Sequence, residues 1–253
     1  MRKLFLGIIA IGLLTGATSA FAADPPVKSW QTPGPSWSGC YIGGNVGAAW
    51  TDFNMAPVNI AGLVFPQGTA AGSAVAGGGQ FGCDYQVDGN WVVGMRGMWD
   101  ATSAQGTTAG TVFVPAPGAS LTTTAQITSF ATAVARGGYS LGPALVYGVG
   151  GVAMAQNQYR QSLATIAATL PFTGSDAPTG WVAGAGFSWM LGPNWDVWVE
   201  YDYLGFGGRT VNTVGTTPPV VSLPNSISQR VQTILFGVDF RFTSLAAGWF
   251  TAR

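Results

Sequence analysis

The chain has 253 residues, of which 47% are hydrophobic and only 8% are charged, and its 10 basic and 10 acidic side chains balance to zero net charge. A soluble protein usually carries about 25% charged residues, so a mainly wetted surface is not expected. A nucleic-acid-binding protein needs a clustered basic patch to release counterions from phosphates, and the chain has no such cluster. We therefore exclude nucleic acid as a partner.

Residues 1–22 are predicted to be a secretory signal peptide. Two basic residues precede an apolar stretch from Leu4 to Leu14, and Ala20-Phe21-Ala22 fits an A-x-A cleavage site. A membrane anchor is the alternative, but the stretch is short for a spanning helix. Cleavage would leave a mature chain that begins with a periplasmic N-terminal segment, residues 23–36.

Eight strands are predicted in the mature chain, because strand-like runs alternate with tight turns and long Thr-, Ala-, Gly- and Pro-rich stretches. The turns are Asp88-Gly89-Asn90, Leu141-Gly142-Pro143 and Gly192-Pro193-Asn194. The long stretches, predicted as loops, are roughly Asp52 to Gly72, Ser103 to Thr123, Tyr159 to Pro178 and Gly207 to Asn225. The strands are Ser38 to Thr51, Ser73 to Gln86, Asn90 to Thr102, Thr124 to Ser140, Ala144 to Gln158, Thr179 to Leu191, Trp195 to Phe206 and Ile227 to Phe242.

Apolar and acidic side chains alternate within these strands, most clearly in WDVWVEYDY, Trp195 to Tyr203. Its Trp, Val and Tyr residues at odd positions share one face, whereas Asp196, Glu200 and Asp202 share the other, with Trp198 as the misfit. No run in the mature chain reaches the roughly 18 apolar residues of a membrane helix, which leaves a closed barrel as the spanning structure. We therefore predict an all-β fold, an eight-stranded antiparallel up-and-down transmembrane barrel over residues 37–242, with short periplasmic turns and four long extracellular loops.

Charged residues on the inward faces are predicted to form an ion-pair network. The bore of an eight-stranded barrel is just wide enough to be filled by side chains, and buried charges need partners. A role in selectivity or gating is the alternative. The register of the fourth and fifth strands stays open, because Phe130 and Val134 fall on the arginine side. The network residues are Arg96, Asp100, Arg136, Glu200, Asp202, Asp239 and Arg241.

Three stretches resemble those of a known family. WSGCYIGGNVGAAW, Trp37 to Trp50, is similar to the opening strand of the alphaproteobacterial outer-membrane immunogenic proteins, small barrels related to the OmpA transmembrane domain and to opacity proteins. VEYDYLGFG, Val199 to Gly207, resembles their penultimate strand, and FGVDFRF, Phe236 to Phe242, their closing strand. The resemblance covers nearly the whole mature chain. It implies a porin-like surface antigen of a Gram-negative outer membrane, monomeric or weakly self-associating.

Two features depart from the family pattern. Cys40 stands where the family commonly has an aromatic residue. A tail of residues 243–253 follows Phe242, where such chains often stop at a terminal aromatic that the barrel assembly machinery recognises. Either Phe242 or Phe250 could serve as that signal, or the tail folds under the barrel mouth.

Aromatic and cysteine residues lie near the strand ends. Antiparallel pairing of the first two strands brings Cys40 near Cys83, and both a disulfide and two free lipid-facing thiols stay open. The aromatic residues are predicted to form interfacial girdles, with ligand stacking as the alternative. The girdle residues are Trp50, Trp91, Trp99, Trp181, Trp189, Trp195 and Tyr203.

The sequence contains few residue patterns typical of catalytic or metal-binding sites. The chain has no histidine, which removes Ser-His-Asp triads, H-E-x-x-H zinc sites and the commonest haem ligand. Glu200 and Asp202 share a strand face, but the nearby arginines favour ion pairing over acid–base work. The glycine runs Gly77 to Gly79 and Gly148 to Gly151 lack a phosphate-loop lysine. We expect no enzymatic activity, no cofactor and no metal.

The sequence favours a structural outer-membrane barrel that supports envelope integrity, displays surface loops, contacts lipid and is inserted by the barrel assembly machinery. A narrow diffusion channel for small solutes is the rival hypothesis. Relatives that bind haemin suggest ligand capture by the loops through Tyr159 or Met55, although the absence of histidine weakens it. A soluble lipocalin-like barrel is the fourth hypothesis.

Overall fold

The computed structural model describes residues 36–60, 62–87, 89–112, 118–216 and 221–242. The predicted signal peptide, residues 23–35 and the tail 243–253 with Phe250 lie outside the described residues. Within the described part of the chain, no helix is long and apolar enough to cross a membrane.

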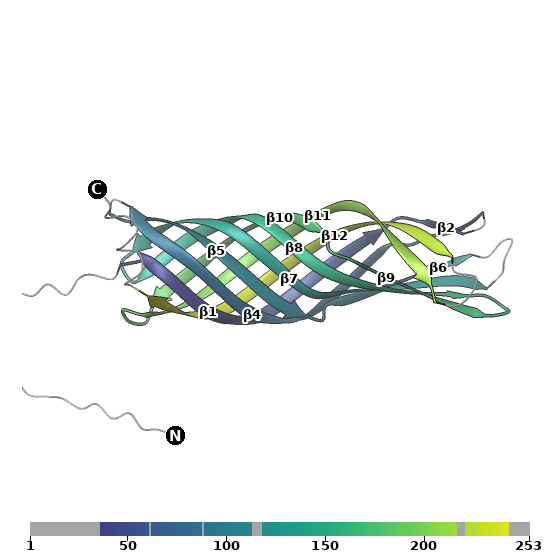
Figure 1. The fold of residues 1–253 in the computed structure, drawn as a ribbon, viewed down its shortest axis with the longest axis horizontal. Coiled ribbons are helices and arrows are strands. Elements are labelled where there is room, and N and C mark those ends of the chain that lie inside the picture. The colour runs from purple at the N-terminus through teal and green to yellow at the C-terminus, as the bar shows by residue number, and fades with distance from the viewer. Residues whose placement is uncertain (1–35, 61, 88, 113–117, 217–220, 243–253) are drawn as a thin grey trace, which may run out of the picture. The chain divides into compact units, whose positions relative to one another are not determined.

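Eight long antiparallel strands close into a barrel (Figure 1). Each strand pairs with the next along the chain, and β1 also pairs with β12, from Cys40 opposite Phe242 to Met55 opposite Ile227, which closes the ring. The predicted eight-stranded, antiparallel up-and-down barrel is therefore confirmed. The strands are β1 (Gly39–Met55), β4 (Thr69–Val87), β5 (Trp91–Thr102), β7 (Ala119–Leu141), β8 (Ala144–Ala164), β10 (Thr179–Met190), β11 (Trp195–Gly215) and β12 (Ser222–Phe242).

Tight turns join the strands at one end of the barrel, where they were predicted. The turn between β4 and β5 contains Gly89 with a φ of 80°, and the turn between β7 and β8 contains Gly142 with a φ of 73°. Residues with side chains rarely adopt such φ values, so glycine suits both positions. The β10–β11 connection comprises residues 191–194.

The four stretches predicted as loops are mostly β-structure, so their predicted bounds are wrong. The barrel strands run on into them, and three-residue strands β2 (Val58–Ile60) and β3 (Leu63–Phe65) form a small hairpin. In addition, β6 (Gln105–Val112) continues the line of β5 beside β7, and β9 (Thr169–Asp176) continues the line of β10 beside β8. Figure 1 shows these extensions as long hairpins at one end of the barrel. Pairing between neighbours satisfies their backbone groups, which outweighed the loop-like composition.

Two β-bulges change which residues face inward. On β7, a register shift between Ile127 and Ser129 moves the buried positions from odd to even numbers, so Phe130 and Val134 point inward together with Arg136. On β11, a register shift between Phe206 and Arg209 moves the buried positions from even to odd numbers. A bulge adds one residue to one strand and reverses the facing of everything beyond it. The open register of the fourth strand is thereby resolved.

Candidate functional site

The lumen holds all seven residues predicted for the ion-pair network, each of them buried. It also holds two buried acids that the sequence-based set omitted, Asp84 and Asp196. Both alternate with outward-facing apolar or aromatic neighbours, which is the signal that would have included them. Among the described residues, the buried charged side chains are therefore six acids and three arginines.

A diametric ion pair crosses the middle of the lumen. Arg96 on β5 binds Glu200 on β11 with both of its terminal nitrogens, and the Nη1–Oε2 distance is 2.9 Å. Three barrel strands separate β5 from β11 on either side of the ring, so this pair spans the bore. The Arg96 guanidinium also lies 5.6 Å from the ring centre of Trp198, the inward-facing misfit of its strand.

Two further arginines meet one aspartate nearer the tight turns. Arg136 and Arg241 both donate to Asp84 Oδ2, at 3.0 and 3.1 Å. Arg241 also pairs with Asp196, and Arg136 donates to the Ser188 hydroxyl at 2.9 Å. These contacts join β4, β7, β10, β11 and β12 through side chains as well as through the backbone.

Each lumen arginine lies against an aromatic ring as well as a carboxylate. The Arg136 guanidinium carbon is 3.7 Å from the ring centre of Tyr147, and that of Arg241 is 4.7 Å from Trp37 and 4.9 Å from Tyr41. Such stacking stabilises a desolvated guanidinium by about 2 kcal/mol. The three arginines therefore fill much of the bore with paired charges and rings, whereas the described residues provide no ion-pair partner for Asp100, Asp202 or Asp239.

Inward glycines make room for the buried acids. A Cβ built on Gly43 would lie 1.8 Å from Asp239 Oδ1, and one on Gly94 would lie 2.1 Å from Asp84 Oδ1. In both cases the glycine is the direct partner of the acid on the neighbouring strand. The carboxylates therefore lie across positions that have no side chain, which gives these strand glycines a specific packing role.

Trp37 closes the lumen at the end with the tight turns. Its side chain is fully buried, its indole Nε1 donates to the Gly142 carbonyl at 3.2 Å, and its carbonyl accepts a hydrogen bond from Arg241 at 3.1 Å. The backbone nitrogen of Trp37 donates to Gln86 Oε1 at 3.0 Å. These hydrogen bonds connect the segment before β1 to β4, to β12 and to the turn between β7 and β8.

A second polar network lies in the extended half of the barrel, the end formed by β2, β3, β6, β9 and the parts of the long strands beside them. Arg209 pairs with Asp176 and donates to the Tyr159 hydroxyl and to Gln229 Oε1, both at 2.9 Å. Asn157 links Asp176 and Gln229 at 3.0 and 2.8 Å. Sequence reasoning missed this network, because Arg209, Asp176 and Tyr159 fell in stretches predicted as loops.

Uncharged groups occupy the lumen beyond that network. Gln161 donates to Asn225 Oδ1 at 2.8 Å and to Thr123 Oγ1 at 3.1 Å. An apolar cluster follows at the far end, partly supplied by the β2–β3 hairpin. Its buried members are Val58, Phe65, Val112, Ala119, Leu121, Leu163, Phe172 and Leu223.

The two residues proposed as haemin contacts are not presented to solvent. Tyr159 is 1% exposed and donates to Asp176, and Met55 is 8% exposed. Tyr159 lies seven residues beyond Val152, the partner of Trp181, and so outside the segment bounded by the aromatic residues. Burial raises the pKa of its hydroxyl, which keeps the group neutral beside Asp176.

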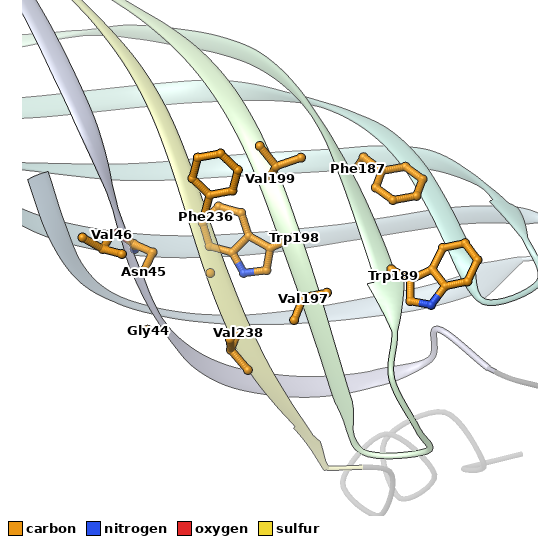
Figure 2. Close-up of a pocket in the computed structure, with 11 residues that line it drawn as sticks. Gly44, Asn45, Val46, Phe187, Trp189, Val197, Trp198, Val199, Phe236 and Val238 are labelled. Carbon is orange, nitrogen blue, oxygen red and sulfur yellow. The ribbon is translucent and has the colours of Figure 1, made fainter. Parts of the chain in front are cut away.

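The outer surface between the strand ends is apolar. Figure 2 shows side chains of β10, β11 and β12 that line a shallow recess on this face, among them Phe187, Val197 and Phe236. Three strands each carry two outward aromatic residues eight positions apart: Trp91 and Trp99, Trp189 and Trp181, and Trp195 and Tyr203. At ~3.3 Å per residue and a strand tilt of ~40°, this spacing corresponds to roughly 20 Å along the barrel axis, close to the ~25 Å apolar band of outer-membrane barrels. Trp50 is also outward-facing.

Cys40 and Cys83 are direct partners in the β1–β4 register and form a disulfide with a Cα–Cα distance of 3.9 Å. Both lie on the outward face, beside Ile42 and Phe81. The bridge therefore links the first two strands near the tight turns, on the apolar side of the wall.

Comparison with known proteins agrees with this architecture. The model of the outer membrane protein beta-barrel domain family matches residues 8–242. The chain belongs to this family. The 31 kDa outer-membrane immunogenic protein of Brucella melitensis biotype 1 is 30% identical over 257 residues, which cover 96% of this chain and 100% of that relative. The 25 kDa outer-membrane immunogenic protein of Brucella abortus biovar 1 is 28% identical and covers 94% of this chain and 97% of its own length.

A solved structure shares the fold of this outer-membrane barrel. The outer membrane protease OmpT of Escherichia coli matches with a TM-score of 0.51, over 81% of this chain and 97% of that chain, at 10% identity, so the likeness concerns the fold alone. The resemblance recognised from the sequence is confirmed. The barrel spans the outer membrane of a Gram-negative bacterium and lies in its lipid. The extended half of this family member is then extracellular, and the tight turns are periplasmic.

Proposed function

We propose that this outer-membrane protein is a closed structural barrel that supports envelope integrity and displays its extended hairpins at the cell surface. The observation that carries the proposal is the filled lumen. The Arg96–Glu200 pair spans its middle, Trp37 closes the periplasmic end, and an apolar cluster occupies the extracellular end. A solute that passed through would have to separate buried ion pairs, and breaking one such pair costs about 3–5 kcal/mol.

Conductance across planar lipid bilayers tests this proposal. The purified full chain should give no steady single-channel steps under conditions in which an established porin does. The matched variant is Arg96→Ala/Glu200→Ala, which removes the diametric pair and leaves neither partner unpaired. It should conduct more than the wild type. Steady steps from the wild-type barrel would instead support the narrow diffusion channel.

We further propose that the barrel catalyses no reaction. The chain has no histidine, and Glu200 and Asp202, the two acids considered for acid–base work, are buried in the lumen. We also propose that a signal peptide cleaved near Ala23 directs secretion and that the barrel assembly machinery inserts the chain. The folded barrel self-associates weakly. Mass spectrometry of the mature N-terminus in the outer-membrane fraction checks the cleavage site.

Haemin capture is disfavoured as a second function. Tyr159 is held by Asp176 and Arg209, and Met55 is buried, so neither offers a ligand to the extracellular side. A spectral titration of the folded protein with haemin should show no Soret shift. A saturable shift would require another contact on the hairpins.

A further inference from the structure

The ladder between β11 and its neighbour is interrupted in the extracellular half. β10 pairs with β11 as far as Trp181 opposite Gly205, and pairing resumes on β9 with Thr173 opposite Val214. Between these two points, no paired positions join β11 to the facing segment within the described residues, although both sides continue to pair with the next strand beyond, β12 or β8. We call this interruption the seam, and its two sides are residues 174–180 and 206–213.

The local sequence accounts for the seam. Between the two paired points β11 has one residue more than the facing segment, because its bulge inserts a residue at Gly207 and Gly208. Pro178, on the facing segment, has no backbone N–H to donate to a ladder. No atom lies within 4 Å of a Cβ built on either glycine, so neither position is covered by a neighbouring side chain. Regular backbone pairing therefore stops at these residues.

Side chains of the second polar network connect the two sides of the seam in place of the backbone. Arg209 on β11 pairs with Asp176 on β9 and donates to the Tyr159 hydroxyl on β8 at 2.9 Å. Asn157 on β8 donates to Gln229 Oε1 on β12 at 2.8 Å. These bonds join hairpin β8–β9 to hairpin β11–β12. The Arg209 and Asp176 side chains are 18% and 16% exposed, against 3% or less for the ion pairs of the spanning half, so water reaches this connection.

The seam begins just outside the apolar band. Trp181 is an outward aromatic residue near the extracellular end of β10, and its indole lies over Gly205, 2.7 Å from a Cβ built there. It stacks on Tyr203 at a ring-centre distance of 5.3 Å. The seam starts one residue beyond Gly205. In hydrocarbon, parting two strands would leave backbone groups without partners, whereas water can satisfy them beyond the aromatic boundary. The wall can therefore part here at a lower cost than in the spanning half.

We propose that the seam is a side gate, at which hairpins β8–β9 and β11–β12 part, and that Arg209 is its latch. Opening gives the outside of the barrel access to uncharged polar groups of the extracellular lumen, among them Asn157 and Gln229. The Arg96–Glu200 pair lies nearer the periplasm and stays closed, so the gate requires no conduction across the membrane. Failure of the gate would therefore leave the proposed structural role of the barrel intact.

Distances between spin labels across the seam test the gate. The labels are attached to Ser175→Cys and Thr210→Cys, two exposed positions on opposite sides, in the full chain reconstituted into phospholipid nanodiscs. Cys40 and Cys83 form the disulfide and take no label. Electron paramagnetic resonance should show a major short distance and a minor longer one. Arg209→Ala should raise the ratio of the long to the short population by about fivefold, which corresponds to loss of an ion pair worth ~1 kcal/mol.

Two controls separate the gate from a general loosening of the extracellular half. Labels on Gln126→Cys and Gln158→Cys, direct partners in the β7–β8 ladder, should show one distance that Arg209→Ala leaves unchanged. Val211→Cys, buried beside the seam, should react with a water-soluble maleimide about fivefold faster when Arg209→Ala is added. Leu121→Cys, buried in the apolar cluster, should react at the same rate with and without that substitution.

Either of two results would overturn the gate. Asp176→Asn removes the same ion pair from the other side, so it should shift the label distances as Arg209→Ala does. One contrary result is a seam distance that is the same in the wild type and in both variants. The other is equal acceleration of the maleimide reaction at Val211→Cys and Leu121→Cys, which would mean that the whole extracellular half loosens when the ion pair is lost.

Discussion

The membrane-spanning half and the extracellular half of this barrel differ in the side chains that fill the lumen and in those that cover the outer face. In the spanning half, three arginines and six acids fill the lumen and apolar side chains cover the outside. In the extracellular half, amide and hydroxyl groups fill much of the lumen, and an apolar cluster lies at the end. The described residues of this half include one charged pair, Arg209 and Asp176. The outer face there carries polar residues such as Thr122, Thr124 and Gln126.

The difference reflects the solvent around each half. Polar side chains are costly in lipid, so most polar groups of the spanning half face inward and are satisfied there. Water around the extracellular half accepts polar groups on both faces, so its strands need no strict alternation. The spanning half should therefore depend on electrostatic pairing, and the extracellular half on backbone pairing and apolar packing.

The largest expected effect comes from Arg96→Ala. The substitution leaves Glu200 buried without a partner, and breaking a buried pair in this way costs about 3–5 kcal/mol. Urea unfolding, followed by the heat-modifiable shift in gel migration, measures the loss. Arg230→Ala is the control, because Arg230 is exposed on β12 and should change stability by less than about 0.5 kcal/mol. Similar losses for both variants would contradict the importance of the lumen pairing.

Removal of the disulfide should have the next largest effect. Cys40 and Cys83 are 43 residues apart in sequence, and a link of this kind stabilises a fold by about 2–4 kcal/mol, mainly by restricting the unfolded chain. The double variant Cys40→Ser/Cys83→Ser should unfold at lower urea. Alkylation of the denatured wild type without reductant should label neither cysteine, and labelling of both would show free thiols instead.

Gly94→Ala should destabilise the spanning half by about 1–3 kcal/mol, because the added Cβ meets Asp84 and the Cys83 carbonyl, and overpacking costs this much. Gly97→Ala, three residues further along β5, is the matched control. Gly97 faces outward, with no atom within 4 Å of an added Cβ. Alanine there should stabilise the strand by roughly 0.5 kcal/mol, since glycine is entropically costly in a strand. Equal effects would mean that the inward glycines have no packing role.

Arg209→Ala should cost about 1 kcal/mol, since its ion pair is partly exposed and screened by water. The loss should be local. Limited proteolysis of the extracellular hairpins should become faster while the heat-modifiable transition of the barrel stays nearly unchanged. If the whole barrel unfolded earlier by the same amount as in Arg96→Ala, the two halves would not differ as described.

Ile166→Ser should have the smallest effect. Ile166 lies between β8 and β9 and is 95% exposed, so its removal changes no packing, and the free energy of unfolding should change by less than about 0.5 kcal/mol. Phe65→Ala is the contrasting variant, because Phe65 is buried in the apolar cluster. It should speed proteolysis of the hairpins, whereas Ile166→Ser should not.

The sequence predicted the strands of the spanning half better than those of the extracellular half. On β11, the alternation from Trp195 to Tyr203 predicted the strand and the facing of every side chain in it, because lipid on one side enforces a strict pattern. Beyond Phe206 the bulge reverses that pattern, and both faces become partly polar. The same segment therefore looked like a loop, and Arg209 was missed as a lumen residue.

The amino-acid sequence alone determined the eight strands, the membrane-facing sides of all but the fourth and fifth, the family, and seven of the nine charged residues buried in the lumen. Lipid requires an apolar exterior, and alternating neighbours in the sequence record that requirement. Only the tertiary structure decided which charges meet. Arg96 and Glu200 are 104 positions apart and approach because the ring closes. Bulges, register and the opposition of Cys40 to Cys83 are likewise properties of paired strands, and they depend on contacts between distant segments that no local pattern records.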